Sequence, residues 1–186
     1  QVTRRLPCTY SIVQNAGRVN SKGIEAEITI KPVRILKLMA YLTYTDAKLI
    51  KTPGTFLGDI GRPVPYFPAF TSTFTLTYEK QIFSKFQFLA FTEHVYTGKR
   101  ETDFRESLSL PMKEFGVINI RAGIKRNGWE VFVFGKNVGN VLGILDRTTS
   151  SVSAIRFIRT TAIPPRTLGI SIVKDFQKAK VFNSKK

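Results

Sequence analysis

The sequence predicts an all-β fold, an antiparallel up-and-down meander of about eight strands. Apolar and polar residues alternate along most segments, and no segment shows a convincing helical period. Short and long links between these segments also alternate along the chain. Because successive side chains of a strand point to opposite sides, such alternation gives each strand one apolar and one polar face.

The expected strands follow one another through most of the chain. They are residues 9–14, 24–31, 36–49, 70–79, 85–97, 118–125, 129–138 and 167–172. The alternation is clearest in 24–31, 70–79, 118–125 and 167–172. Segments 85–97 and 129–138 carry apolar residues on both faces, so their assignment depends more on the β-branched and aromatic content.

The links between the strands are of two kinds. Short turns are expected at 31–35, 79–85 and 126–128, and the last contains Asn127-Gly128, a strong hairpin signal. Long connections are expected at 48–68, 98–114 and 140–165, which hold most of the Pro and Gly. Outer-membrane barrels have short periplasmic turns at one rim and longer loops at the other. A soluble antiparallel sheet gives the same residue alternation, so the link lengths are what favour a membrane barrel.

Composition excludes several classes of protein. No apolar run approaches the roughly 20 residues of a membrane helix, so a membrane-embedded chain would have to be a barrel. The net charge of +16 is spread along the chain and forms no stripe typical of nucleic-acid binding. With His94 the only histidine and Cys8 the only cysteine, we expect no enzyme, no metal centre and no cofactor. The chain begins at Gln1 without a signal peptide, so we expect a fragment or a processed chain.

Several motifs, in this order, resemble the C-terminal barrel of TonB-dependent receptors. They are N-A-G at 15–17, S-K-G-I-E-A-E at 21–27, Y-L-T-Y-T-D-A at 41–47, V-P-Y-F-P at 64–68, K-N-V-G-N at 136–140 and P-P-R-T-L-G-I-S-I at 164–172. Phe176 stands where the family has its terminal aromatic residue, although ten residues follow it here. The motif residues expected to have structural roles are Gly23, Glu25, Asp46, Asn137, Pro165, Arg166, Gly169 and Phe176. We expect Gly23 to serve a loop-to-strand turn, Asn137 to cap or bend a strand end, and Pro165 to end a loop.

The resemblance implies that residues 1–176 are the C-terminal strands of a larger transmembrane barrel and that 177–186 are a basic C-terminal extension. Barrels of this family have roughly 22 strands around a plug, so the remaining strands and the plug would lie upstream. The implied function is energised uptake of a scarce nutrient of the siderophore, cobalamin or saccharide class across the outer membrane of a Gram-negative bacterium. The implied partners are outer-membrane lipid and lipopolysaccharide, the plug domain and, through it, TonB, with no nucleic acid. Two alternatives remain: a small passive outer-membrane barrel, and a soluble basic β protein that binds a polyanion.

Two further expectations concern side chains. Apolar residues should face lipid, and polar residues, among them Thr71, Thr73, Thr75, Asn119 and Arg121, should face the lumen. Five arginines in the presumed outer loops could contact an anionic ligand, or they could pair with the lipid surface or nearby carboxylates. They are Arg100, Arg105, Arg147, Arg156 and Arg159.

Overall fold

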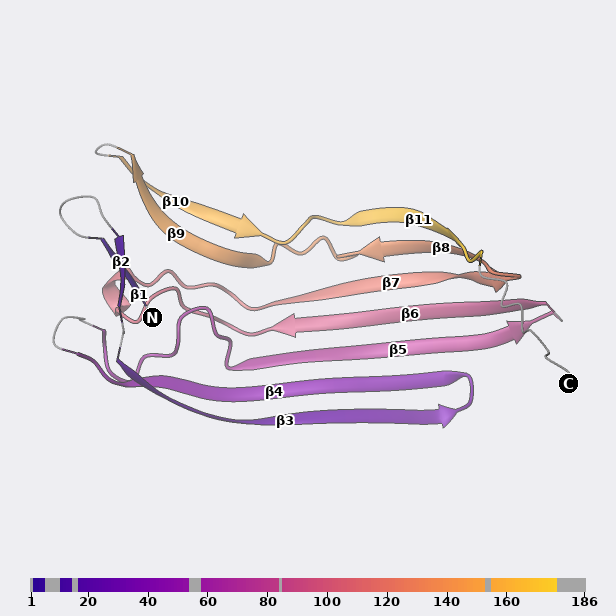
Figure 1. Cartoon of the computed structure of the whole chain (residues 1–186), viewed down its shortest axis with the longest axis horizontal. Coiled ribbons are helices and arrows are strands. Elements are labelled where there is room, and N and C mark those ends of the chain that lie inside the picture. The colour runs from indigo at the N-terminus through magenta and orange to yellow at the C-terminus, as the bar shows by residue number, and fades with distance from the viewer. Residues whose placement is uncertain are drawn as a thin grey trace, which may run out of the picture.

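The computed structural model describes residues 2–5, 11–14, 17–53, 58–83, 85–152 and 155–176. Their strands form one seven-stranded sheet and two two-stranded hairpins (Figure 1). The strands are β1 (Val2–Arg5), β2 (Ser11–Gln14), β3 (Arg18–Val33), β4 (Leu36–Lys51), β5 (Phe70–Ile82), β6 (Phe86–Thr97), β7 (Phe115–Arg126), β8 (Trp129–Lys136), β9 (Ile144–Val152), β10 (Ile155–Ala162) and β11 (Thr167–Lys174). A single turn of 3-10 helix, Glu106–Leu108, lies between β6 and β7.

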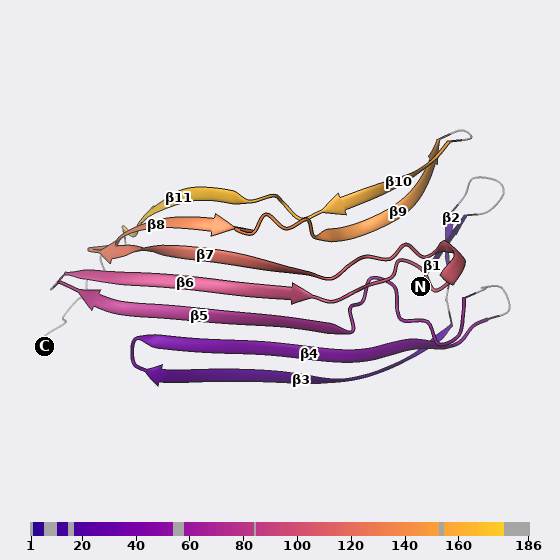
Figure 2. The ribbon, with the colours of Figure 1, turned by 180° about the vertical axis from the view of Figure 1, so that it is seen from behind.

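The large sheet confirms the predicted antiparallel meander. Strands β3 to β8 are neighbours in chain order, and β11 completes the sheet by pairing with β8. The sheet has seven strands instead of about eight, because the segment expected at 9–14 contains β2, which pairs with β1 in a separate hairpin. Strands β3 and β11 form the two edges of the open sheet (Figure 2).

The links lie as the alternation of their lengths predicts. The short links β3–β4, β5–β6 and β7–β8 are at one end of the sheet, called the turn rim here. The long connections β4–β5, β6–β7 and β8–β11 are at the opposite end, the loop rim. In the β7–β8 turn, Asn127 and Gly128 have φ values of 47° and 76°. Positive φ at both central residues is what a type I′ hairpin turn requires.

The third long connection corrects the sequence-based expectation of a loop at 140–165. Residues 144–152 and 155–162 form the β9–β10 hairpin. The hairpin extends beyond the loop-rim end of β8 and β11 (Figure 1). The run of Thr and Ser at 148–151 is typical of a loop. Thr is nevertheless β-branched, and β-branched residues favour strands.

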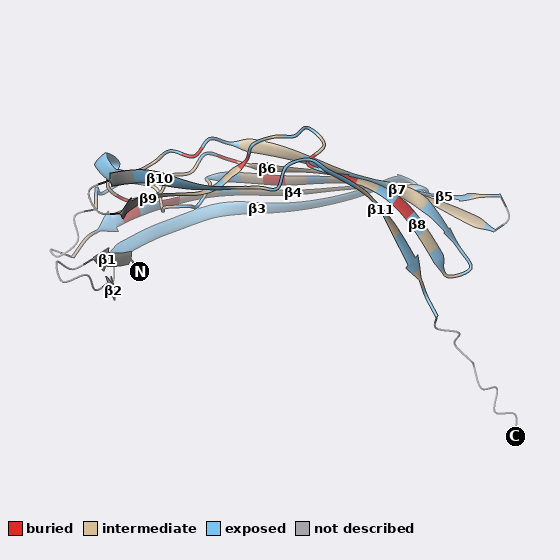
Figure 3. Ribbon diagram, turned by 90° about the horizontal axis from the view of Figure 1, so that it is seen from above, coloured by how far each residue is buried: buried red, intermediate tan, exposed pale blue. Residues whose placement is uncertain are grey.

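The large sheet has one apolar and one polar face. On the apolar face, Ile120 lies opposite Thr92 and Gly135, and Phe74 lies opposite Ala40 and His94. Large apolar side chains of this face are solvent-exposed, among them Ile24, Phe74, Ile118, Ile120, Val133, Leu168, Ile170 and Ile172. Figure 3 shows only scattered buried residues along the strands. Within the described residues, therefore, no second layer of secondary structure covers the apolar face.

Aromatic side chains gather at two levels of the apolar face. Tyr44 and Phe70 are opposite each other near the loop rim, and the Phe70 and Tyr96 rings have centroids 5.9 Å apart. Toward the turn rim, the Tyr78 and Phe88 rings meet edge-on at 6.0 Å. Phe70 and Tyr78 are eight residues apart on β5, which is about 26 Å along a strand. The apolar face is thus a band bounded by two aromatic rows.

In the part of the chain that the structure describes, no helix has the length and hydrophobicity needed to cross a membrane.

Candidate functional site

The polar face of the sheet carries a connected set of side chains where β6, β7 and the end of β8 meet. The Asn119 side-chain amide donates to Glu93 Oε2 at 2.9 Å, and its Oδ1 accepts the backbone N–H of Asn137 at 3.0 Å. Thr75 lies opposite Glu93 on this face. Thr71 and Thr73 share the face, because alternate residues of a strand point to the same side. The polar face can therefore offer hydrogen-bonding groups to anything that lies against it.

Two phenylalanines of β8 lie across glycines of the neighbouring strands on the polar face. A Cβ on Gly123 would come within 2.6 Å of the Phe132 ring, and one on Gly169 within 2.5 Å of the Phe134 ring. The Arg121 guanidinium stacks on Phe132, 3.7 Å from the ring centroid. Gly169, a residue of the last sequence motif, thus leaves the space that an aromatic neighbour fills.

Asn137 organises the break between β8 and β9. It is only 4% exposed and has φ 47°, a left-handed conformation that Asn tolerates better than most residues. Its Nδ2 donates to Val141 O at 2.9 Å and to Pro164 O at 3.1 Å, and its Oδ1 accepts the Val141 N–H at 2.9 Å. One side chain therefore fixes the turn that follows β8 and ties it to the segment that precedes β11.

The same junction brings two of the sequence motifs into contact. Asn140 Oδ1 accepts the Arg166 N–H at 3.0 Å, and Arg166 Nη1 donates to Val138 O at 3.4 Å. Pro165 directly precedes this contact, and its carbonyl accepts the Thr167 hydroxyl at 3.1 Å. K-N-V-G-N and P-P-R are 24 or more residues apart in sequence, so their spacing alone gives no sign that they meet.

The other motif residues are dispersed. The expectation for Gly23 was wrong: it lies inside β3 without a positive φ, and the close approach of the Tyr44 carbonyl leaves no room for a Cβ there. Glu25 is exposed and lies opposite Thr43. Asp46 pairs with Lys48 at 2.9 Å near the loop rim. Phe176 follows β11 at the turn rim and is 85% exposed, and the expected extension at 177–186 lies outside the described residues.

Residues 58–68 and 98–114 fold together at the loop rim into what we call the loop platform. Its small core consists of Leu49 and Phe104, with Val64 packed against them. Backbone hydrogen bonds attach it to β4, from Leu49 N to Arg62 O at 3.0 Å and from Val64 N to Ala47 O at 3.0 Å. The two segments also bond to each other, from Tyr66 N to Glu101 O at 2.7 Å.

Charged groups inside the loop platform are largely paired with one another. Arg62 Nη2 is 3.2 Å from Glu101 Oε2, and Ser109 Oγ donates to the same carboxylate. Arg105 binds Asp103 through Nε at 2.9 Å and Nη2 at 2.7 Å. Burial alone would raise the pKa of Asp103, but hydrogen bonds from the Arg105 side chain and backbone outweigh it and hold that pKa below its usual value.

The β9–β10 hairpin is tied to the loop platform by two of the arginines singled out from the sequence. Arg100 Nη2 donates to Ile144 O at 2.5 Å, and Arg147 Nη1 donates to Pro111 O at 3.0 Å. Burial lowers the pKa of the Arg100 guanidinium from its ordinary value. Tyr66 and Asp146 lie near the same contact, and burial together with the negative charge of Asp146 raises the pKa of the Tyr66 hydroxyl. Arg100 and Arg147 thus both take part in the contact between the loop platform and the hairpin, where each binds a backbone carbonyl.

The remaining candidate arginines differ from these two. Arg105 is held by Asp103, Arg159 is exposed on β10, and the side chain of Arg156 lies outside what the structure describes. Sequence reasoning missed Arg62, Glu101 and Tyr66 as members of the loop platform. Tyr66 has φ 64°, an unusual conformation for an aromatic residue, and its flanking prolines were the only local signal of a constrained loop.

Within the described ranges, no group of three or more His, Cys, Asp or Glu side chains is placed to hold a metal ion.

Comparisons with known proteins agree with this geometry. Residues 1–138 match the family model described as TonB dependent receptor-like, beta-barrel. The crystal structure of BauA, the ferric preacinetobactin receptor from Acinetobacter baumannii, superposes with a TM-score of 0.66 over 92% of this chain at 18% identity. The chain spans 24% of the length of that receptor, and at this identity the likeness shows a shared fold. Comparison with curated protein sequences gives no match.

Because the family model covers most of the chain and the sheet has the antiparallel meander of part of such a barrel, the chain belongs to the TonB-dependent receptor β-barrel family, which consists of outer-membrane receptors and transporters, not enzymes.

Proposed function

We propose that residues 1–176 form strands of the barrel of an outer-membrane receptor that takes up a scarce nutrient with energy delivered through TonB, and that 177–186 are a basic extension. The observation that carries this proposal is the exposed apolar face between two aromatic rows, which no other described segment covers. With a strand tilt of about 35–45°, the 26 Å between the rows becomes roughly 20 Å of membrane depth, close to the apolar band of about 25 Å in such barrels.

The two alternatives fit the geometry less well. A complete small barrel would join its first and last strands, whereas β3 and β11 lie at opposite edges of the sheet and pair only with β4 and β8 among the described residues. A soluble protein seldom exposes an apolar patch of several strands, because such a surface associates or aggregates. Both features support one wall of a larger barrel, whose remaining strands and plug belong to the rest of the receptor.

The proposed orientation assigns a role to each surface. The apolar face contacts lipid, the polar face lines the lumen toward the plug, and the turn rim faces the periplasm. The loop platform and the β9–β10 hairpin then face outside, where ligand and lipopolysaccharide are encountered. For the ligand class we propose a ferric chelate, on the grounds that BauA is a ferric preacinetobactin receptor with this fold and that the chain carries a net charge of +16.

Uptake by a strain that lacks the full-length receptor tests this function. We expect the deletion to abolish energised uptake of at least one radiolabelled ferric chelate from a panel under iron limitation, and reintroduction of the receptor to restore it. Uptake of cobalamin and of maltodextrin serves as the control. If ferric uptake is unchanged while one of these is lost, the ligand class is wrong, and if uptake persists without TonB, the receptor is a passive barrel.

The arginines of the outer hairpin provide a second test. Arg159 is exposed and has no carboxylate partner among the described residues, unlike Arg105. We expect the double variant Arg156→Gln, Arg159→Gln of the full-length receptor to bind its ferric chelate with a slower association rate at low salt. At high salt the difference should vanish, because screening acts over about 8 Å already at physiological ionic strength.

Stopped-flow fluorescence quenching measures this rate, and Lys85→Gln at the turn rim is the matched control, since Lys85 is also exposed. Arg100 and Arg147 are left intact because they hold loop carbonyls. If the association rate is unchanged at low salt, the two arginines do not help to capture the ligand, and only a contact with the lipid surface remains for them.

A further inference from the structure

Aromatic and cationic side chains alternate across four strands at the turn rim, on the apolar face. Arg126 lies opposite Trp129, and Trp129 lies opposite Lys174. The Arg126 guanidinium is 4.5 Å from the centroid of the Phe86 ring, and Lys174 Nζ is 4.9 Å from that of Trp129. We call Phe86, Arg126, Trp129 and Lys174 the cation–aromatic row.

No salt bridge of the two cations of this row is found in the part of the chain that the structure describes. The carboxylate of Glu130 lies on the polar face, where it pairs with Lys125 at 2.6 Å. Because side chains alternate along a strand, the neighbours Lys125 and Arg126 point to opposite faces. Among the described residues, neither Arg126 nor Lys174 forms an ion pair, and Lys174 Nζ donates one hydrogen bond, to Asn127 O at 3.0 Å. Both cations can therefore accept an anionic partner on the apolar side.

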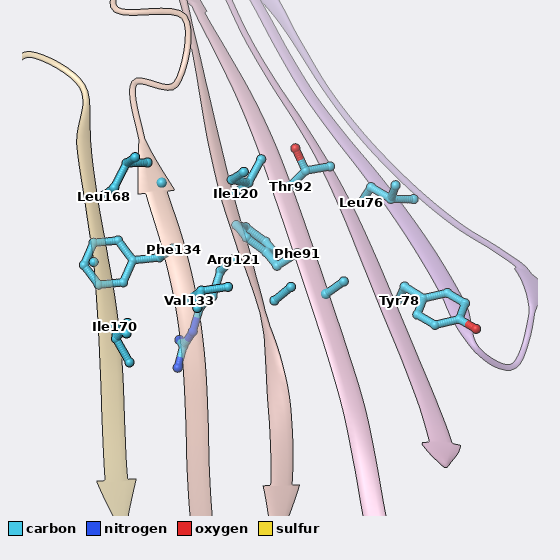
Figure 4. A pocket seen from close by; sticks show the side chains of 14 residues that line it. Leu76, Tyr78, Phe91, Thr92, Ile120, Arg121, Val133, Phe134, Leu168 and Ile170 are labelled. Carbon is cyan, nitrogen blue, oxygen red and sulfur yellow. The ribbon is translucent and has the colours of Figure 1, made fainter.

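An apolar hollow of about 710 Å³ lies on the same face, farther from the turn rim (Figure 4). Its floor includes the small residues Ala90 and Ala122, which are opposite each other on β6 and β7. Tyr78 bounds it on one side and Ile170 on the other, as Figure 4 shows. Ala122 and Arg126 are four residues apart on β7, which is about 13 Å along the strand. The cationic edge and the apolar depression thus lie on one face, about 13 Å apart along β7.

From this juxtaposition we propose that the turn rim holds an anionic phospholipid, with its phosphate at Arg126 and Lys174 and one acyl chain in the hollow. The arrangement suits a lipid, because the charged headgroup and the apolar chain find complementary surfaces at the right separation on one face. The assignment of a phospholipid rests on the proposed function, in which the turn rim lies at the periplasmic side of the membrane. Trp129 and Phe86 occupy the interfacial level where aromatic rings sit beside headgroups.

The test uses the full-length receptor, purified in detergent and examined by native mass spectrometry with added phosphatidylglycerol. We expect wild-type receptor to retain the lipid, and the double variant Arg126→Gln, Lys174→Gln to bind it at least tenfold more weakly. Ala122→Leu, which places a larger side chain on the floor of the hollow, should weaken binding with the cations intact. Two controls are matched: Lys136→Gln removes a cation 5.9 Å from the Phe134 ring on the polar face, and Ala26→Leu enlarges a residue of β3 outside the hollow.

Several outcomes would overturn the inference. If the double variant binds phosphatidylglycerol as tightly as wild type does, the two cations do not hold the lipid. If Ala122→Leu binds it as tightly as wild type does, the hollow does not hold the acyl chain. Displacement of the lipid by inorganic phosphate alone would indicate a simple anion site, and preferential retention of lipopolysaccharide would assign the surface to the other leaflet. Ferric uptake by the same variants keeps the two proposals apart, because uptake can stay normal when lipid binding is lost.

Discussion

Lysine in place of Phe74 is expected to block assembly of the full-length receptor into the outer membrane, whereas lysine in place of the adjacent Thr75 is expected to be tolerated. Phe74 is halfway between Phe70 and Tyr78 on β5, at the middle of the apolar band. A lysine facing lipid at mid-depth costs a barrel about 2–4 kcal/mol. Thr75 points to the polar face, opposite Glu93, so a lysine there gains a carboxylate neighbour.

Heat-modifiable mobility on gels and the amount of receptor in the outer-membrane fraction measure this difference. Phe74→Ala separates the cost of the charge from the loss of the aromatic ring, and we expect it to assemble far better than Phe74→Lys. Equal assembly of the Phe74→Lys and Thr75→Lys receptors would mean that the apolar face does not contact lipid. That result would favour a soluble sheet in which this face is covered by another part of the protein.

The parts of this fold that depend on local pattern could be predicted from the sequence. Period-two alternation in β5 and β7 assigns each residue to a face, and the register then brings apolar residues of neighbouring strands together. Asn127-Gly128 fixes a two-residue turn because both positions need positive φ. In β6 the pattern is less clear, since Leu89 and Phe91 lie on the polar face, opposite Gly123 and Arg121.

The parts that depend on contacts between distant segments could not be predicted in this way. The strands β9 and β10 have no regular alternation of apolar and polar residues, so with their threonines they resemble a polar loop in sequence. Arg100 and Arg147 are exposed loop residues by pattern, but each binds a backbone carbonyl 36 or more residues away. Asn119 belongs to the polar face as expected, yet nothing local shows that it bonds Glu93 and the N–H of Asn137.

Replacing Asn137 by glycine is expected to lower the free energy of unfolding of the receptor by about 2–3 kcal/mol, because three side-chain hydrogen bonds of about 1 kcal/mol each are lost. The three bonds join the buried amide to Val141 and Pro164, so the substitution leaves backbone groups at the β8–β9 break without their partner. Glycine tolerates the φ of 47°, so backbone strain does not contribute. Asn137→Asp should be worse, since a carboxylate would replace the donor that faces two carbonyl oxygens.

The matched control is Asn127→Gly in the β7–β8 turn. Asn127 has the same φ of 47°, and no side-chain hydrogen bond of Asn127 is found in the described part of the chain. Urea unfolding of the full-length receptor, followed by tryptophan fluorescence, should therefore show a lower midpoint for Asn137→Gly and an almost unchanged one for Asn127→Gly. If the two midpoints agree, the left-handed backbone alone accounts for asparagine at both positions, and the break between β8 and β9 is held by Arg166 and Asn140 without help from the Asn137 amide.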